Sequence, residues 1–167
     1  MTILYLHGLE SKLNLEKRAV LERFGTVFAP DLDYYSDPNV FISLMKTNEK
    51  NHYDIVMGSS MGGFMGYYIA NTIKCPALLF NPALPHRPVN QEIPEINPLN
   101  ASPQMTIALG GEDQIIKAND TLKWLSKNRT ADTDFQLFIH KEMGHQVPIA
   151  IFEIEVTRFF EQYNYLK

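Results

Sequence analysis

The sequence predicts an α/β fold, a three-layer α/β/α sandwich around a mainly parallel sheet of about six strands. Short apolar runs alternate along the chain with longer segments compatible with helices, which is typical of a parallel sheet with covering helices. A length of 167 residues favours a single domain over residues 1–167, large enough to bury a core. The expected strands are Ile3–Leu6, Thr26–Ala29, Asp54–Met57, Ala77–Phe80, Thr106–Leu109 and Phe135–Ile139.

Helix signals lie between these strands. Asn14 can cap a first helix that ends at Gly25. Asp37-Pro38 predicts the start of a second helix, because a capping aspartate there precedes a proline at the first helical position. The last helix is expected to begin near Pro148. Its apolar stripe is expected to pack in the core and comprises Ile149, Phe152, Val156, Phe159 and Tyr163.

Composition excludes several classes of function. The net charge is −4, from 15 basic and 19 acidic side chains without a basic block, so no nucleic-acid partner is expected. No apolar stretch approaches the ~20 residues that span a bilayer, so no membrane partner is expected. The N-terminus lacks the features of a signal peptide and Cys75 is the single cysteine, which together predict a cytoplasmic protein. No metal-ligand spacing is present, and neither a metal nor a cofactor is expected.

The strongest functional signal is Gly-x-Ser-x-Gly, directly after the third expected strand. A sharp strand-to-helix turn crowds the backbone, so Gly58 and Gly62 would be required to lack a Cβ. Ser60 would then project its hydroxyl clear of the sheet, while Met61 opens a helix. Only Ser60, and not its neighbour Ser59, has glycine two residues away on both sides. The pattern therefore predicts a nucleophile elbow centred on Ser60.

Two further features give the chain a family resemblance. Asp113 and His145 follow Ser60 in the order Ser…Asp…His of the α/β-hydrolase fold. His7-Gly8-Leu9 ends the first apolar run, where that fold places its second oxyanion donor. From Ile3 to the C-terminal helix, the sequence therefore resembles an α/β-hydrolase.

Within that superfamily the short chain resembles the compact bacterial YqiA-like esterases. The residues that carry this likeness are Leu4–Gly8, Gly58–Gly63 and Asn81-Pro82-Ala83. The resemblance implies a minimal α/β-hydrolase fold without a cap domain, with strands in the order 2-1-3-4-5-6. That order reverses beside strands one and three, so both motifs would open onto one crevice at the carboxyl ends of these strands.

The resemblance also implies roles for the site residues. A serine hydroxyl needs a base to take its proton, and His145 lies in the loop between the last strand and the last helix where the family carries its base. A carboxylate must orient that base, and the turn from Gly110 to Asp113 resembles the family's Gly-x-x-Asp turn. Asp113 is the expected acid, although Glu112 remains a rival because a slip of one residue would exchange them.

The oxyanion donors implied by the resemblance are the backbone N–H groups of Leu9 and Met61. His7 and Gly8 would support the first of these loops, with His7 bracing it rather than accepting the proton. Gly58 and Gly62 would support the turn around the nucleophile.

A proline-rich segment follows the fourth strand. Residues 81–103 hold six of the ten prolines, and the segment is too short for a helical cap domain. The sequence leaves open whether it is a surface connection or one wall of the site. Its apolar residues are Leu84, Val89, Ile93, Ile96 and Leu99. A single wall would leave a shallow site, suited to acyl groups of about two to six carbons.

The predicted function is a serine hydrolase that cleaves small carboxylic esters or thioesters through an acyl-enzyme. The partner would be a small-molecule substrate alone, and the sequence leaves the oligomeric state open. The alternatives are an acyltransferase or amidase with the same Ser-His-Asp triad, or a non-catalytic binding protein with this fold.

Overall fold

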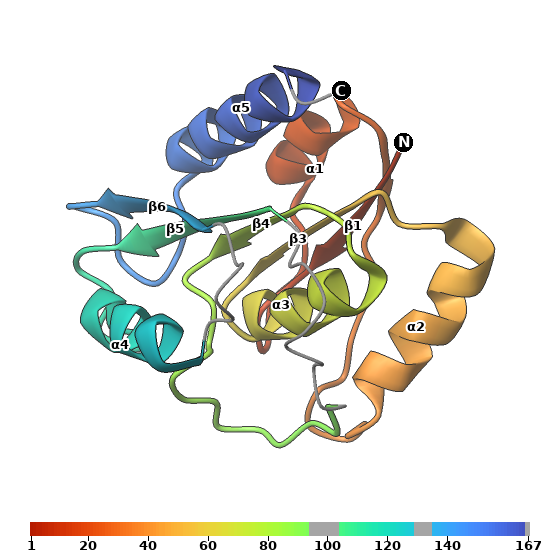
Figure 1. The fold of residues 1–167 in the computed structure, drawn as a ribbon, viewed down its shortest axis with the longest axis horizontal. Helices are drawn as coiled ribbons and strands as arrows, with labels where there is room; N and C mark the ends of the chain where they lie inside the picture. The colour runs from red at the N-terminus through yellow and green to blue at the C-terminus, as the bar shows by residue number, and fades with distance from the viewer. Residues whose placement is uncertain (94–103, 129–134, 166–167) are drawn as a thin grey trace.

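A computed structural model describes residues 1–93, 104–128 and 135–165 of the chain (Figure 1). These residues form one six-stranded sheet in which every neighbouring pair is parallel, in the order β2-β1-β3-β4-β5-β6. The strands are β1 Thr2–Leu6, β2 Thr26–Phe28, β3 Ile55–Ser59, β4 Ala77–Phe80, β5 Met105–Gly110 and β6 Phe135–His140. The predicted strands and their order are therefore confirmed, with ends that shift by one or two residues.

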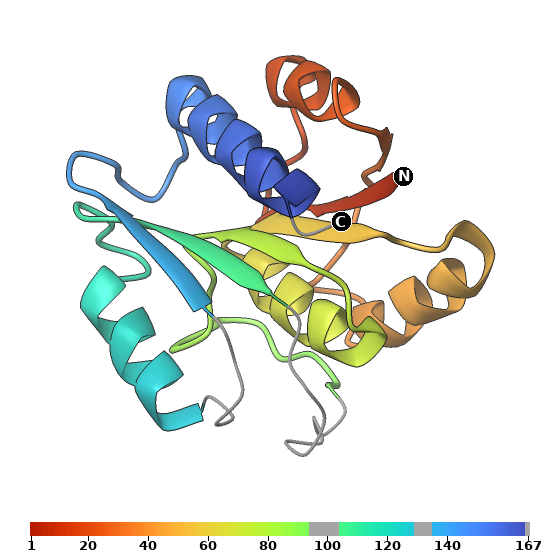
Figure 2. The ribbon, with the colours of Figure 1, turned by 45° about the horizontal axis from the view of Figure 1, so that its top comes forward.

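Helices cover both faces of the sheet. The described helices are α1 Leu15–Glu22, α2 Val40–Asn51, α3 Met61–Ile73, α4 Ala118–Asn128 and α5 Ile149–Tyr165. Figure 2 shows α1 and α5 on one face, and α2, α3 and α4 on the other. The three-layer α/β/α architecture is confirmed. None of the described helices is both long and apolar enough to cross a lipid bilayer.

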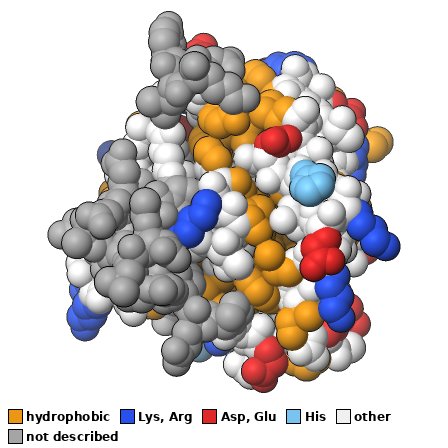
Figure 3. Space-filling model, turned by 45° about the vertical axis from the view of Figure 1, so that its right-hand side comes forward, with side chains coloured by type: hydrophobic (Ala, Val, Ile, Leu, Met, Phe, Trp, Pro, Cys, Tyr) orange, Lys and Arg blue, Asp and Glu red, His pale blue; other side chains and the backbone are white. Residues whose placement is uncertain are grey.

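The strands supply two separate cores because alternate side chains point to opposite faces of a sheet. In β1, Leu4 and Leu6 pack with α2 and α3, whereas Ile3 and Tyr5 pack with α1 and α5. Both faces of the central strands are buried, as expected for a parallel sheet. On the outside, Figure 3 shows a band of hydrophobic side chains bordered on one side by acidic and basic ones.

The start of α2 differs from the prediction. Its N-cap is Asn39, not Asp37, and the helix begins at Val40. The Asp37 carboxylate instead accepts a hydrogen bond from the Asn39 N–H at 2.8 Å. Aspartate readily closes such a local turn with the backbone two residues ahead, which competes with helix capping.

Helix α1 is capped as predicted, since the Asn14 side chain accepts from the Lys17 N–H at 2.9 Å. It ends at Glu22, before the expected end at Gly25. Gly25 passes close to the N-terminus, where an added Cβ would lie 2.7 Å from the Met1 carbonyl oxygen. The chain has therefore already left the helix to enter β2.

Two further predictions need correction at the C-terminal half of the chain. Helix α4 is absent from the sequence prediction, although Leu122 and Leu125 pack at helical spacing against the core. Most of the predicted stripe on α5 lies in the core, but Ile149 is 37% exposed. It begins the helix and lines the groove that contains Ser60 and His145.

The contact between α3 and β1 generates a stability prediction at Gly62. A Cβ on Gly62 would overlap the Leu6 carbonyl oxygen and lie 2.5 Å from that of His7. Gly62→Ala should therefore lower the free energy of unfolding by about 3 kcal/mol, measured by urea denaturation.

Gly144→Ala is the matched control, because a Cβ there meets nothing within 4 Å and the φ of Gly144 is not positive. It should change the free energy of unfolding by less than about 0.5 kcal/mol. Equal losses in the two variants would show that the close approach at Gly62 does not limit stability.

Candidate active site

Ser60 lies at the sharp turn between β3 and α3. Its backbone has φ 54° and ψ −117°, which a residue with a side chain rarely adopts. The Ser60 N–H donates to the Phe80 carbonyl oxygen at 2.9 Å. The Ser60 carbonyl oxygen accepts from the N–H groups of Phe64 and Ala83, each at 3.0 Å. Contacts from β4, from the segment after it and from α3 therefore hold the turn in this conformation.

The glycines around Ser60 allow the backbones to approach one another. A Cβ on Gly58 would overlap the Gly62 carbonyl oxygen, which is the crowding that the sequence predicts. A Cβ on Gly8 would lie 3.1 Å from the Ser60 Cβ. The loop after β1 thus lies directly against the turn.

His7 is fixed within that loop. Its Nε2 accepts from the Leu32 N–H at 2.9 Å, and its Nδ1 lies 2.6 Å from the Gly8 carbonyl oxygen. The His7 carbonyl oxygen accepts from the Tyr34 hydroxyl at 3.1 Å. With both ring nitrogens occupied in a buried position, His7 holds the loop between β1 and the segment after β2.

A continuous chain of hydrogen bonds links the three residues predicted to be catalytic. His145 Nε2 lies 3.0 Å from Ser60 Oγ, and His145 Nδ1 lies 2.8 Å from Asp113 Oδ2. The Asp113 side chain is fully buried, whereas that of His145 is 23% exposed. With a proton on Nδ1, the imidazole donates to Asp113 and presents a lone pair to the serine hydroxyl.

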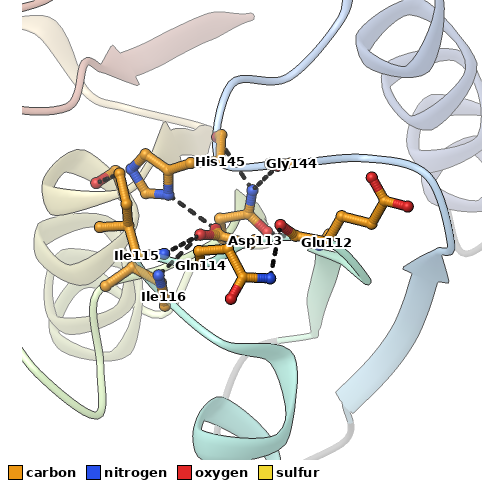
Figure 4. Close-up of polar contacts among 10 residues, drawn as sticks. Glu112, Asp113, Gln114, Ile115, Ile116, Gly144 and His145 are labelled. Atoms are coloured by element: carbon orange, nitrogen blue, oxygen red, sulfur yellow. Dashed lines mark hydrogen bonds and ion pairs between the residues drawn. The ribbon is translucent and has the colours of Figure 1, made fainter.

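Asp113 is oriented by its own turn (Figure 4). Its Oδ1 accepts from the N–H groups of Ile115 and Ile116, each at 2.8 Å, which leaves Oδ2 for His145. Glu112 is exposed, and its side chain points away from the imidazole. The structure therefore brings Asp113, and not the rival Glu112, to the histidine.

Asn81 joins the acid turn to the base loop. It is fully buried at the end of β4, with a positive φ of 42°. Its Oδ1 accepts from the Gly110 N–H at 2.7 Å, and its Nδ2 donates to the carbonyl oxygens of Gly144 and His145 at 3.0 and 3.1 Å. In the sequence, Asn81 stands out only as part of the Asn81-Pro82-Ala83 motif.

The turn after β5 also packs backbone against backbone on the loop of His145. A Cβ on Gly111 would lie 2.6 Å from the Lys141 carbonyl oxygen, and one on Gly110 would overlap the Met143 carbonyl oxygen. The Glu112 N–H donates to that same Met143 oxygen at 3.0 Å. The paired glycines in this turn are a sequence signal for this close contact.

A groove of about 640 Å³ contains Ser60 and His145. Leu9 and Met61 line it beside them, and Met61 begins α3, so its N–H has no partner within the helix. Leu9 and Met61, the two residues predicted to supply oxyanion donors, therefore line the same groove as Ser60.

The described part of the proline-rich segment, residues 81–93, contributes little of the groove wall. Ala83 and Pro88 line the groove. Leu84 is buried in the core, and Val89 and Ile93 pack against it, so these apolar side chains do not form the substrate wall that was considered. Ile96 and Leu99 lie outside the described residues.

Other reactive groups lie apart from this site. Burial raises the pKa of the Cys75 thiol to about 12, which makes it an inert core residue. Of the remaining histidines, His140 contacts Glu155 at 2.8 Å, and His52 and His86 are exposed. Across residues 1–93, 104–128 and 135–165, no group of three His, Cys, Asp or Glu side chains is arranged to hold a metal ion.

Comparison with known protein families gives a match to the chain. Residues 2–109, more than half of the chain, match the model of an Uncharacterised protein family, UPF0227. The chain belongs to UPF0227. This is the YqiA-like family, so the predicted resemblance is confirmed. No curated protein matches the chain significantly.

Solved structures share the fold of this UPF0227 member. A Xanthomonas campestris protein assigned to the alpha/beta superfamily of hydrolases is 18% identical, with 98% of each chain covered and a TM-score of 0.69. Mouse alpha/beta hydrolase domain-containing protein 10 is 12% identical over 99% of this chain and 90% of its own, with a TM-score of 0.74. The Bacillus cereus carboxylesterase is 14% identical over 96% and 87%, with a TM-score of 0.67. At these identities the likeness establishes the fold.

The contacts of Asn81 generate a prediction for its isosteric replacement. In Asn81→Asp the carboxylate cannot donate to the Gly144 and His145 carbonyl oxygens, and it places a buried charge against both. The variant should lose about 3 kcal/mol of unfolding free energy at neutral pH. Because burial favours the protonated acid and so raises its folded pKa, the loss should shrink between about pH 7 and about pH 4.

Asn119→Asp is the control, since Asn119 is exposed in the first turn of α4. Denaturation of both variants across this pH range measures the difference. A loss at Asn81 no larger than that at Asn119, or one that grows on acidification, would show that the amide hydrogen bonds are not required.

Proposed function

We propose that this protein is a serine hydrolase that cleaves small carboxylic esters or thioesters. The proposal is carried by one observation, the hydrogen-bonded chain from Ser60 through His145 to the buried carboxylate of Asp113. A serine hydroxyl is weakly nucleophilic alone, and an oriented neutral imidazole within hydrogen-bonding distance is the group that activates it.

In the first half-reaction, Nε2 of His145 takes the proton of Ser60 Oγ as that oxygen bonds to the substrate carbonyl carbon. Asp113 holds the Nδ1 proton and stabilises the imidazolium that forms. His145 then gives its Nε2 proton to the departing alcohol or thiol, as the bond to the leaving group breaks. The product of this half-reaction is an acyl-enzyme on Ser60.

The backbone N–H groups of Leu9 and Met61 are the proposed donors to the oxyanion. Both residues line the groove at Ser60, and the close packing at Gly8 brings the Leu9 loop against the serine. Backbone donors fixed in advance stabilise the charge that develops on the carbonyl oxygen without reorganising during the reaction.

Water is the proposed acceptor of the acyl group. The His145 side chain is 23% exposed, so water can reach Nε2 after the leaving group departs. His145 removes a proton from that water as the water oxygen bonds to the acyl carbon. The bond between Ser60 Oγ and the acyl carbon then breaks while His145 returns the proton to Oγ, which releases the acid and restores the free serine. This solvent access favours hydrolysis over acyl transfer, the main alternative with the same three residues.

The groove size supports small substrates. A volume of about 640 Å³ is within the range for small-molecule sites, and its described walls combine apolar side chains with charged ones. Esters or thioesters of short acyl groups therefore remain the proposed substrates. The alternative activities are hydrolysis of an amide and transfer of the acyl group to an acceptor other than water.

Ser60→Ala tests the proposal directly. Loss of the nucleophile should reduce kcat for p-nitrophenyl butanoate by roughly 10⁶-fold while leaving the circular dichroism spectrum unchanged. In Ser59→Ala, which removes the neighbouring hydroxyl, the reduction should stay below about tenfold. Retained activity in Ser60→Ala, together with loss in Ser59→Ala, would show that Ser59 and not Ser60 is the nucleophile.

Asp113→Asn tests the acid. An amide favours the wrong tautomer of His145, so kcat should fall by roughly 10⁴-fold, measured with the same ester. Glu112→Gln makes the same chemical change one residue earlier, on an exposed side chain, and should have little effect. The reverse pattern would mean that Glu112 orients the base.

A further inference from the structure

We propose that Lys17 forms an anion-binding subsite in the groove of Ser60, so that the preferred substrates are esters or thioesters bearing a second, acidic group. This inference rests on the proposed function and narrows its substrate class. The shared chemistry is a carboxylate, located either on the acyl part of the substrate or on its leaving group.

The first observation is the position of Lys17. It is the third residue of α1 and lines the same groove as Ser60 and His145. Its own N–H donates to the Asn14 cap at 2.9 Å, which fixes the start of this helix beside the site. The side chain of Lys17 therefore extends from a rigid element.

The second observation is that Lys17 is partly buried, and that its ammonium forms no ion pair with a carboxylate of residues 1–93, 104–128 or 135–165. Its described contact is with the ring of Phe152, whose centroid lies 5.3 Å from Nζ. Burial lowers the pKa of Lys17, because removing an ammonium from water disfavours its charge. An anionic ligand would compensate for that lost hydration.

The ring beneath the ammonium is itself fixed. Phe152 is fully buried, stacked on Phe80 with ring centroids 5.2 Å apart and edge-on to Tyr5 at 6.1 Å. The Lys17 ammonium thus lies over a rigid aromatic ring, on a residue that lines the groove. Such a preorganised cation needs little ordering to bind an anion.

The other charged side chains of the groove differ from Lys17. Lys12 is exposed and donates to the Asp31 carboxylate at 2.5 Å. Glu10 and Glu16 are exposed, and the Glu10 carboxylate accepts from the Tyr35 hydroxyl at 3.4 Å. Of the two lysines that line the groove, the one with a described acidic partner is Lys12, which leaves Lys17 for the substrate.

Matched esters test the subsite. The acyl arm compares mono-p-nitrophenyl adipate with p-nitrophenyl hexanoate, whose chains have equal numbers of carbons. The leaving-group arm compares 3-carboxyphenyl butanoate with phenyl butanoate. In each arm the measured quantity is the ratio of kcat/KM for the acidic ester to kcat/KM for the neutral one. A charge-assisted contact should make this ratio about tenfold higher in the wild type than in Lys17→Met, in at least one arm.

Two variants serve as controls. Lys17→Arg keeps the charge and should retain most of the ratio. Lys12→Met removes the lysine that already has a partner and should also retain it. A ratio that Lys17→Met leaves unchanged in both arms, or that Lys12→Met lowers as much, would overturn the inference.

Salt dependence gives a measurement that needs no variant. Raising ionic strength to about 0.5 M should lower the wild-type ratio, because salt screens a partly exposed charge pair. A ratio that does not respond would count against the subsite. Failure of the proposed function looks different: Ser60→Ala would hydrolyse the neutral esters as fast as the wild type does.

Discussion

The strand-to-helix turn at Ser60 is the constraint on which the rest of the site depends. A positive φ at a residue with a side chain costs on the order of 1–3 kcal/mol, so the surroundings must enforce it. Three backbone hydrogen bonds of Ser60 do so, together with the contact between Gly58 and Gly62 that no larger residue allows. This one conformation directs the hydroxyl into the groove and sets α3 against the sheet.

A second requirement is that the acid and the base, which come from different loops, are held in line with this hydroxyl. The buried amide of Asn81 fulfils this requirement, because it bonds to Gly110 on one side and to Gly144 and His145 on the other. The carboxyl ends of β4 and β5 are thereby joined to the loop that follows β6. The short distances from His145 to Ser60 and to Asp113 are a property of this joined edge and not of any single loop.

The sequence predicted the parts of this arrangement that leave a local signature. Gly58 and Gly62 mark the turn because their lack of a Cβ is visible in the sequence. The alternation of apolar runs predicted the positions of the strands, and the family resemblance implied their order. Asn14 was recognisable as a cap. Asp37 was wrongly predicted to cap α2, because its carboxylate instead bonds to the Asn39 N–H in a local turn. Helix ends depend on such small differences in energy.

Other features could not be predicted because their partners are distant or carry no side-chain signal. Asn81 bonds to carbonyl oxygens more than sixty residues away, and every residue has a carbonyl group. Lys17 is inferred to bind an anion because it lacks a described acidic partner, which only the folded chain reveals. Helix α4 is different, because the helical spacing of Leu122 and Leu125 is visible in the sequence and is sufficient to predict it.

The central claim is that this packing makes Ser60, among all the hydroxyl groups of the chain, an activated nucleophile. Reaction of the folded protein with a fluorophosphonate, followed by peptide mass spectrometry, measures this most directly. The account predicts a single adduct, on Ser60, and none after denaturation. An adduct on Ser59 or another residue, or no adduct on the folded protein, would contradict it.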